Sequence, residues 1–402
     1  MSRDEEYREG TRSVHLPRSP ELASDPLVPP VVHSSTFAFE TAQEYADVLG
    51  GRKPGFSYTR IDNPTAVTFA NAVAALEGFG VAADVAGEAF GSGMAAISAV
   101  LLAFTGSGAH VVAPAACYGG TFGLLRNVLA RFGVESTFVE GNDPAAYRAA
   151  CRPNTRLIWG ETIANPTLAV ADLPALATVA HDAGALLAID STFASPAVCR
   201  PLEHGVDLVI HAATKYLGGH SDATGGAVVG RPDLVAQVRA VRVDTGGILA
   251  PDEAYLLHRG LATLPLRVAR QCTTAQAFAD ALVRHPRVAR VDYPGLSDHP
   301  DHALAKALFD SGRYGGCVTV TPNGDQATGM ALCDGLRLAR IAASLGGHHT
   351  IVSHAASTTH RQLDEAALAA AGIGAATVRF SMGLEDPADL IADAEQSLDA
   401  MP

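Results

Sequence analysis

Hydrophobic residues in the first two thirds of the chain alternate between short continuous runs and longer stretches with helical spacing. Residues 65–78 carry apolar side chains three and four positions apart and end at Gly78 and Gly80, which predicts a helix. Helical spacing returns at 121–132 and 173–184. The continuous apolar runs lie at 109–114, 134–140, 156–162, 185–192, 206–212 and 225–230. Apolar strands separated by helices of this kind predict a parallel sheet that is covered on both faces.

The pattern changes after Gly247. A long helical stretch at 251–285 is followed by shorter segments that predict a smaller α+β domain. The predicted strands lie at 288–294, 315–322, 338–344 and 377–382, and the predicted helices lie at 326–336 and from Pro387 onward. The fold class expected from the whole pattern is α/β, with a mostly parallel central sheet in the large domain.

The first 60 or so residues are rich in proline and polar residues, and steps into proline disfavour helix. We expect an extended N-terminal arm at 1–62, a large α/β domain at 63–255 and a C-terminal α+β domain at 256–402. The chain contains no internal repeat and no long block of charge.

Composition excludes several classes of protein. With 48% hydrophobic and 18% charged residues, the chain is not disordered. A net charge of −13 argues against nucleic acid or an anionic membrane as a partner. No run approaches the ~20 apolar residues of a membrane helix, and the charged start does not resemble a signal peptide. Six cysteines without a C-x-x-C pattern predict reduced thiols and a cytoplasmic location.

Lysine is scarce, because only Lys53, Lys215 and Lys306 occur among 29 basic residues. Lys215 follows the apolar run at 206–212 and precedes a Gly-Gly break. Desolvation at such a strand end disfavours the ammonium form and favours the neutral amine that attacks a carbonyl. The alternative is a lysine that reaches from the strand end into solvent.

In the preceding segment, 185–192, Asp190 ends a run of five apolar residues, so it should lie at the same edge of the sheet as Lys215. Pyridoxal phosphate (PLP) needs a lysine for its aldehyde and an aspartate for its ring nitrogen, and this pair suits it. The alternatives for Asp190 are a strand-end cap or an ion pair with the lysine.

Residues 87–104 contain a turn of small residues that leads directly into an apolar helix, and a helix N-terminus of this kind binds phosphate. The spacing of Gly91, Gly93 and Ala96 also matches a dinucleotide fingerprint loosely, but no acidic residue follows at the expected distance. Phe90 excludes the G-x-S-x-G pattern of hydrolases around Ser92.

Nine segments in order resemble the Cys/Met-metabolism family of PLP enzymes, which contains the methionine and cystathionine γ-lyases, cystathionine γ-synthase and the homoserine-ester sulfhydrylases. The segments are FSYTRIDNPT, GSGMAAI, CYGGTF, GETIANPT, IDSTFASP, HAATKYLGGHSD, RGLATLPLR, SLGG and VRFSMGLEDP. They span nearly the whole chain. The resemblance implies fold type I of the PLP enzymes and a homotetramer built from two catalytic dimers.

The resemblance also implies roles for particular residues. Lys215 would be linked covalently to PLP, Asp190 would face the ring nitrogen, and Tyr118 would stack on the ring with its hydroxyl near the leaving group. The phosphate would be held by Gly93, Met94 and Thr214, together with Tyr58 and Arg60 of the adjacent subunit. The substrate carboxylate would be bound by Arg379, with Asn165 and Ser344 nearby. No metal is expected.

Departures from the family's patterns mark what is particular to this chain. Ala212 and Ser191 stand where the family has serine and asparagine, and His349 and Ala355 replace a glutamate and a proline near the SLGG segment. Four histidines, at 348, 349, 354 and 360, could suggest a metal cluster, but no other ligand set supports one. An altered edge of the pocket or ordinary loop histidines explain them better.

The resemblance implies chemistry at the γ-position of an amino acid, by elimination or by replacement with a thiol. Family members that handle cystathionine often carry an arginine where this chain has Ile61 or Gly123. Without that cation, a short or apolar γ-substituent is favoured over a second amino-acid carboxylate. Gly120 stands where methionine γ-lyases carry a cysteine. We therefore predict γ-elimination, with γ-replacement as the alternative. The presence of every core catalytic position argues against a PLP-fold protein without activity.

Overall fold

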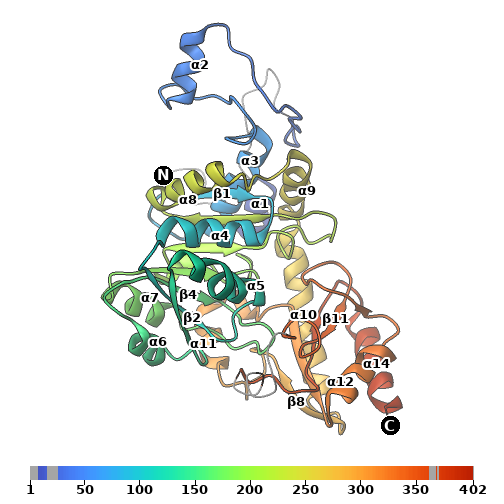
Figure 1. Ribbon diagram of the computed structural model, residues 1–402. Helices are drawn as coiled ribbons and strands as arrows, with labels where there is room; N and C mark the ends of the chain where they lie inside the picture. The colour runs from blue at the N-terminus through green and yellow to red at the C-terminus, as the bar shows by residue number, and fades with distance from the viewer. Residues whose placement is uncertain (1–7, 16–25, 362–367, 369–370, 402) are drawn as a thin grey trace.

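The computed structural model describes residues 8–15, 26–361, 368 and 371–401 (Figure 1). The chain forms two sheets of different size, and a protruding N-terminal segment stands above the larger one. Within the described ranges, no helix is both long enough and apolar enough to cross a membrane.

The N-terminal segment is not simply extended. It contains the helices α1 (Glu9–Val14) and α2 (Ala42–Leu49), so the expectation of an extended arm was wrong for these residues. The hydroxyl of Thr41 caps α2 by accepting the N–H of Glu44, and the helix itself lacks proline. No residue of α2 is buried, and Figure 1 shows the helix projecting from the body. Residues 1–7 and 16–25, which the expectation also covered, lie outside the described residues.

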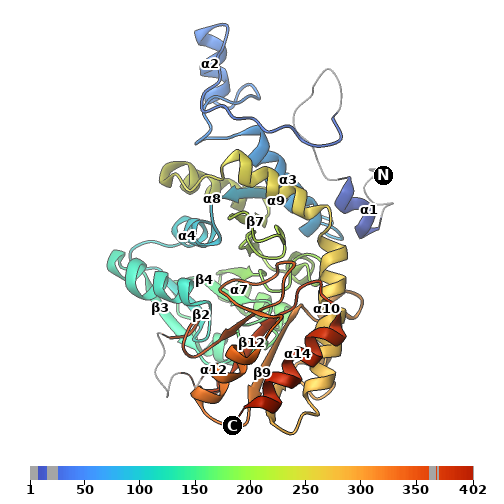
Figure 2. The ribbon, with the colours of Figure 1, turned by 90° about the vertical axis from the view of Figure 1, so that its right-hand side faces the viewer.

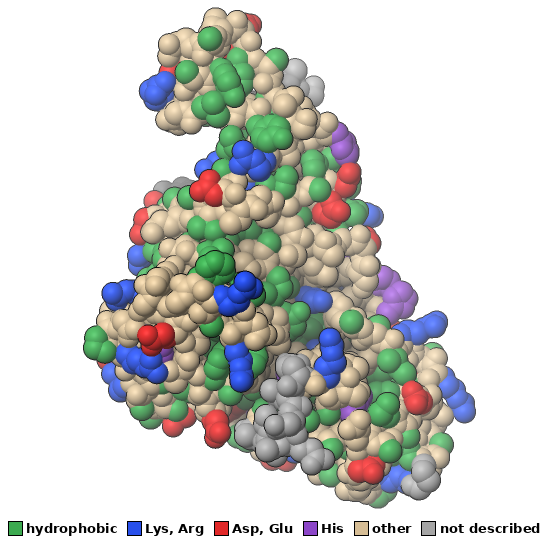
Figure 3. Space-filling model, viewed as in Figure 1, with side chains coloured by type: hydrophobic (Ala, Val, Ile, Leu, Met, Phe, Trp, Pro, Cys, Tyr) green, Lys and Arg blue, Asp and Glu red, His purple; other side chains and the backbone are tan. Residues whose placement is uncertain are grey.

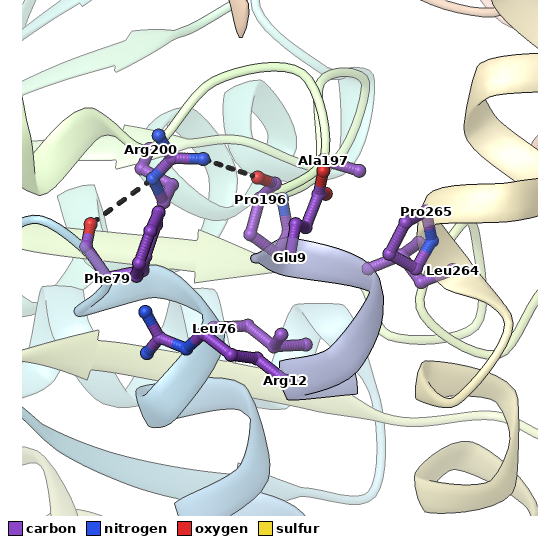
Figure 4. A pocket seen from close by; sticks show the side chains of 9 residues that line it. All are labelled: Glu9, Arg12, Leu76, Phe79, Pro196, Ala197, Arg200, Leu264 and Pro265. Carbon is purple, nitrogen blue, oxygen red and sulfur yellow. Dashed lines mark hydrogen bonds between the residues drawn. The ribbon is translucent and has the colours of Figure 1, made fainter. Parts of the chain in front are cut away.

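Helix α1 lies against the body of the protein. Glu9 accepts a hydrogen bond from Arg313 at 2.8 Å, and the Arg12 guanidinium lies 3.9 Å from the centroid of the Phe79 ring. A pocket of about 10 Å³ beside α1, shown in Figure 4, has room for about one water molecule. Its lining consists of Glu9, Arg12, Leu76, Phe79, Pro196, Ala197, Arg200, Leu264 and Pro265. None of these is a candidate site residue.

The larger sheet has seven strands in the order β1-β7-β6-β5-β4-β2-β3. Its strands are β1 (Ala86–Phe90), β2 (His110–Pro114), β3 (Glu135–Val139), β4 (Thr155–Glu161), β5 (Leu186–Asp190), β6 (Leu208–His211) and β7 (Gly226–Gly230). Five neighbouring strands run parallel, namely β3, β2, β4, β5 and β6. Strand β7 is antiparallel to both of its neighbours, β6 and β1. The mostly parallel α/β fold is therefore confirmed, whereas β1 was not predicted.

Helices cover both faces of this sheet, as the continuous apolar strands predicted. They are α3 (Pro64–Glu77), α4 (Gly93–Phe104), α5 (Gly119–Gly123), α6 (Pro144–Ala150), α7 (Leu173–Asp182) and α8 (Pro232–Thr245). Leu187 of β5 packs into a core that contains Leu176 of α7, and its neighbour Ala188 packs into a second core that contains Ile97 of α4. Alternate residues of one strand thus fill two separate cores.

The helical stretch predicted at 121–132 is not one α-helix. After α5 the chain continues as a π-helical segment, Leu124–Val128, and a 3₁₀ segment, Leu129–Phe132. It ends at Gly133, whose φ of 79° lies in the left-handed region that favours glycine.

The second sheet has five strands in the order β10-β11-β12-β9-β8. Its elements are β8 (Val288–Asp292), α11 (His302–Leu308), β9 (Cys317–Pro322), α12 (Gln326–Gly335), β10 (Arg340–Ile341), β11 (Ile351–His354), β12 (Val378–Ser381) and α14 (Pro387–Ala400). The stretch at 251–285 forms two helices, α9 (Pro251–Leu261) and α10 (Leu264–Leu282), and Figure 2 shows α10 running from the large domain along the small sheet. Strand β11 was not predicted, and β10 is shorter than expected.

Charged side chains of both signs are interspersed on the face shown in Figure 3.

Candidate active site

Lys215 lies in the loop after β6 and not at the strand end, because β6 stops at His211. Its Nζ donates a hydrogen bond to Ser344 Oγ at 2.6 Å. Burial lowers the pKa of Lys215 to about 8, and the positive charge of Arg379 acts in the same direction. The sequence argument for a desolvated lysine therefore agrees with the structure, although the lysine is placed by a loop.

Asp190 is the last residue of β5 and stands beside Ile210 of β6 in the parallel register. Its Oδ1 accepts the N–H of Thr192 at 3.0 Å. Burial raises the pKa of Asp190, and the bonds from Thr192 and the charge of Lys215 oppose this rise. The acid and the lysine therefore leave the same edge of the sheet, as the sequence predicted.

The N-terminus of α4 faces this edge. Ser92 caps the helix by accepting the N–H of Ala95, which leaves the N–H groups of Gly93 and Met94 at the open end. A Cβ at Gly93 would come within 2.6 Å of the Ala212 Cβ, so glycine permits close approach to the loop after β6.

Thr214 also belongs to this loop. Its Oγ1 accepts the N–H of Gly225 at 3.0 Å. The side chain thus fastens the lysine loop to the start of β7 and lies next to Lys215 in the chain.

Arg379 lies on β12 in the small sheet and is buried, with 3% of its surface exposed. Its Nη1 donates to Asn165 Oδ1 at 2.8 Å, and its Nη2 donates to the Ser344 carbonyl oxygen at 2.8 Å. Its Nε is buried without a hydrogen-bond partner. The structure thus brings together the three residues expected to bind a carboxylate, and the orphaned Nε is a donor suited to one.

Tyr118 is 46% exposed and directly precedes α5. Its backbone N–H donates to Glu161 Oε1 at 2.6 Å. A Cβ at Gly120 would lie 2.6 Å from Tyr118 Cε1 and 2.7 Å from Met94 Sδ. Glycine at this position therefore lets the tyrosine ring and the methionine approach each other.

Tyr58 and Arg60 lie apart from these groups. Both side chains are exposed, and Arg60 Nη1 donates to the Val243 carbonyl at 2.7 Å, near the end of α8. Within the described part of the chain, none of their hydrogen bonds or ion pairs leads to Lys215.

The histidines near the SLGG segment form a small aromatic cluster. The ring centroids of His348 and His349 are 4.1 Å apart, and those of His348 and His220 are 6.0 Å apart. Across the described residues, no group of three or more His, Cys, Asp or Glu side chains could hold a metal ion.

Glu161 was not among the residues singled out from the sequence, although it lies in the quoted segment GETIANPT. It is the last residue of β4, is 6% exposed, and stands beside Asp190 in the register of β4 and β5. A carboxylate that ends a buried strand next to the strand of Asp190 is the signal that could have identified it.

The residues at this edge fit PLP. Lys215 offers an amine whose pKa is lowered toward neutrality, Asp190 offers a carboxyl for a ring nitrogen, and α4 offers free N–H groups for a phosphate. The orphaned Arg379 Nε offers a donor for the carboxylate of an amino-acid substrate.

The sheet and this set of groups define a PLP-dependent enzyme. Residues 10–399 match the family model described as Cys/Met metabolism PLP-dependent enzyme, and the chain belongs to that family. The resemblance noted in the sequence is therefore confirmed, together with the cofactor and the enzyme class.

Relatives differ in the reaction that their names describe. An L-methionine gamma-lyase from Fusobacterium nucleatum is 40% identical over 97% of this chain and 98% of its own length. A cystathionine gamma-synthase from Mycobacterium bovis is 39% identical over 99% of this chain and 100% of its own.

A solved structure shows the same fold with the cofactor attached to lysine. A Campylobacter jejuni protein described as an O-acetylhomoserine (thiol)-lyase superposes with a TM-score of 0.93 at 30% identity. The match covers 98% of this chain and 100% of that one, and that structure contains a pyridoxyl-lysine phosphate.

Proposed function

We propose that this enzyme catalyses γ-elimination on a sulfur-containing or homoserine-derived amino acid, giving a 2-oxo acid, ammonia and a thiol or other leaving group. The observation that carries the proposal is the meeting of Lys215 and Asp190, at one edge of the large sheet, with Arg379 of the small sheet. Both Asp190 and Arg379 act on the pKa of Lys215, and Ser344 contacts both Lys215 and Arg379. The name of the Fusobacterium relative supports elimination. Gly120, which stands where methionine γ-lyases carry a cysteine, keeps γ-replacement as the second candidate, which the cystathionine gamma-synthase relative also supports.

Each residue has a distinct task in this proposal. PLP, when bound, withdraws electrons from the substrate Cα and so acidifies the Cα–H bond. Arg379, held by Asn165 and Ser344, binds the substrate carboxylate. Lys215 accepts the Cα proton as a neutral amine, and Asp190 holds the ring nitrogen. Tyr118 acts as acid or base at the leaving group, and Gly93, Met94 and Thr214 hold the phosphate.

The reaction type is tested by incubating the enzyme with methionine, cystathionine, O-acetylhomoserine and O-succinylhomoserine, each with and without an added thiol. We expect ammonia and 2-oxobutyrate from methionine or a homoserine ester in the absence of thiol. A thioether formed only with added thiol, with no 2-oxobutyrate in any reaction, would show that replacement is the activity.

The γ-substituent that this enzyme prefers depends on charge near the leaving group. Ile61 is half-buried and supplies no cation, and its carbonyl accepts a hydrogen bond from Arg242 at 2.5 Å. A Cβ at Gly123 would have only the Asn127 side chain, at 3.8 Å, within contact distance. His348 is a poor replacement for an arginine, because burial lowers the pKa of its imidazole, and the neighbouring His349 and His220 act in the same direction.

We expect the wild-type enzyme to process cystathionine less efficiently than methionine or a homoserine ester. Ile61→Arg should raise kcat/KM for cystathionine about tenfold relative to that for the smaller substrates. One partly solvated charge contact accounts for roughly 1.4 kcal/mol, which corresponds to this factor. Val283→Arg, which adds the same charge at the exposed end of α10, serves as the control. A wild-type kcat/KM for cystathionine above that for every smaller substrate contradicts the proposal.

We propose further that the enzyme is a homotetramer of two catalytic dimers, in which Tyr58 and Arg60 complete the phosphate site of the neighbour. Both side chains are exposed, which supports this assignment. The hydrogen bonds that hold their backbone against α8 support it as well. The buried Arg242 donates to the carbonyls of Arg60 and Ile61 and pairs with Glu88 at 2.7 Å. Tyr58 and Arg60 are thus exposed side chains on a backbone that Arg242 holds in place, an arrangement suited to contact with a partner subunit.

Mixing two inactive variants tests this shared site. Arg60→Ala and Lys215→Ala chains should recover about one quarter of wild-type activity after subunit exchange, because half of the randomly formed dimers are mixed and each holds one intact site. Each variant alone, taken through the same exchange, is the control. No recovery after demonstrated exchange would mean that each site is built within one chain.

We also propose a cytoplasmic location, supported by six cysteines that are all free thiols. The division into an arm at 1–62, a cofactor domain at 63–255 and a C-terminal domain at 256–402 is likewise a proposal. The two separate sheets support it, and the second boundary falls within α9.

A further inference from the structure

Glu161 joins two loops that carry proposed site residues. Its Oε1 accepts the backbone N–H of Tyr118 at 2.6 Å, and its Oε2 lies 3.4 Å from the backbone N–H of Asn165, which donates to it. Tyr118 follows β2 and Asn165 follows β4, so the contacts link loops of two adjacent strands. One side chain thus ties the segment of the ring-stacking tyrosine to the segment that supports Arg379.

Glu161 also stands in direct register with Asp190, so its carboxyl leaves the same sheet edge. Burial raises the pKa of Glu161 to about 8, and the charge of Asp190 adds to this rise. Of the other groups around it, the Cys117 thiol and the Tyr147 phenol have pKa values raised by burial and are neutral at pH 7. Burial also raises the pKa of Asp190, and the hydrogen bonds from Thr192 and the charge of Lys215 oppose that rise.

Burying the Glu161 carboxyl costs free energy, which its two hydrogen bonds must offset. A carboxyl in a buried place beside another acid is disfavoured, and an alanine or a leucine would fill the end of a buried strand without that cost. The two backbone N–H groups that donate to Glu161 lie in loops after β2 and β4, where neither a helix nor a sheet supplies an acceptor for them. A side-chain acceptor with two oxygens satisfies both.

We propose that Glu161 is a positioning residue, which holds the Tyr118 and Asn165 loops in one arrangement and acts on the cofactor and substrate through them. The assignment rests on the proposed function for the roles of Tyr118 and Asn165. It distinguishes Glu161 from Asp190, which faces the cofactor itself. The alternative is a strand-end acid that contributes only to general stability.

A double-mutant cycle separates these two roles. Glu161→Ala, Tyr118→Ala and the double variant are compared by the dissociation constant for PLP, measured by titrating the apoprotein, and by kcat on the best substrate. We expect each single variant to bind PLP about tenfold more weakly than the wild type. Because Glu161 acts through Tyr118, the double variant should bind PLP no more weakly than the more impaired single variant. In kcat, Glu161→Ala should lose up to about 100-fold, as small misplacements of reacting groups do.

Two further variants complete the experiment. Glu161→Gln keeps an oxygen for the Tyr118 N–H without ionising, so its PLP affinity should stay within about threefold of the wild type. Glu135→Gln, an exposed glutamate on β3 paired with Arg152, is the matched control. Thermal unfolding of each apoprotein shows whether a variant has folded.

Several results would overturn the proposal. These are wild-type PLP affinity and kcat in Glu161→Ala, single effects that multiply in the double variant, or a Glu161→Gln protein as impaired as Glu161→Ala. PLP binding is measured without substrate, so this test stands even where the γ-elimination assay gives no product. A failure of the proposed function and a failure of this inference are therefore distinguishable.

Discussion

Lys215→Ala should abolish turnover and remove the visible absorbance band of the bound cofactor. Proton transfer by a positioned side chain typically contributes about 10²–10⁴-fold, and the lysine also anchors PLP, so a loss of more than about 10⁴-fold in kcat is expected. With its pKa lowered to about 8, Lys215 has a substantial neutral fraction near pH 8, and its amine is held by a hydrogen bond to Ser344. Activity and absorbance of the purified variant, with PLP added, check the result.

The control is Lys306→Ala, which removes an exposed lysine of α11 far along the chain. It should keep both the band and the activity. A Lys215→Ala protein that retained a band reducible by borohydride would place the covalent link on another lysine and contradict the assignment. Thermal unfolding shows whether the variant is folded.

Arg379→Ala should raise KM strongly and reduce kcat/KM by at least about 30-fold. Removing one partner of a buried, hydrogen-bonded charge pair costs about 2–5 kcal/mol, and each 1.4 kcal/mol is tenfold. Arg379→Lys should recover little, because a single ammonium cannot keep the contacts to Asn165 and Ser344 and also replace the unpaired Nε donor. Initial rates over a range of substrate concentrations separate KM from kcat.

Arg290→Lys on β8 of the same sheet is the matched control, because Arg290 is paired with Asp292 and lies outside the site. The cofactor band of Arg379→Ala should remain, since Arg379 binds substrate and not PLP in this proposal. An unchanged KM in a folded, PLP-loaded Arg379→Ala protein would show that another cation binds the carboxylate.

Local patterns determined a large part of this structure. The apolar runs of β2, β4, β5 and β6 were found within about two residues of their bounds, because buried parallel strands are continuously hydrophobic. Lys215 and Asp190 were singled out because a charged residue after such a run is costly to bury unless it has a function. The order of nine segments was enough to indicate the family that the comparison confirms.

Several elements of the fold could not be predicted from the local pattern of apolar residues. The antiparallel direction of β7 follows from pairing with β1 and β6, and β1 itself is a short run that contains glycine and glutamate. Helix α2 forms within a proline-rich segment because Thr41 caps it. The break of the helix at 121–132 into π and 3₁₀ turns is likewise not visible in the spacing of its apolar residues.

The sequence by itself determined the fold class and, through the order of nine family segments, the cofactor. It predicted Lys215 and Asp190 as the groups that bind the cofactor, because a charged residue at the end of an apolar run is unusual. Only the tertiary structure placed Arg379 against Asn165, 214 positions earlier in the chain, and Glu161 beside Asp190 with its oxygens on two loops. The physical reason is that strand pairing and loop packing decide distances between residues far apart in the chain. A lowered pKa at Lys215 or a raised one at Glu161 depends on those distances.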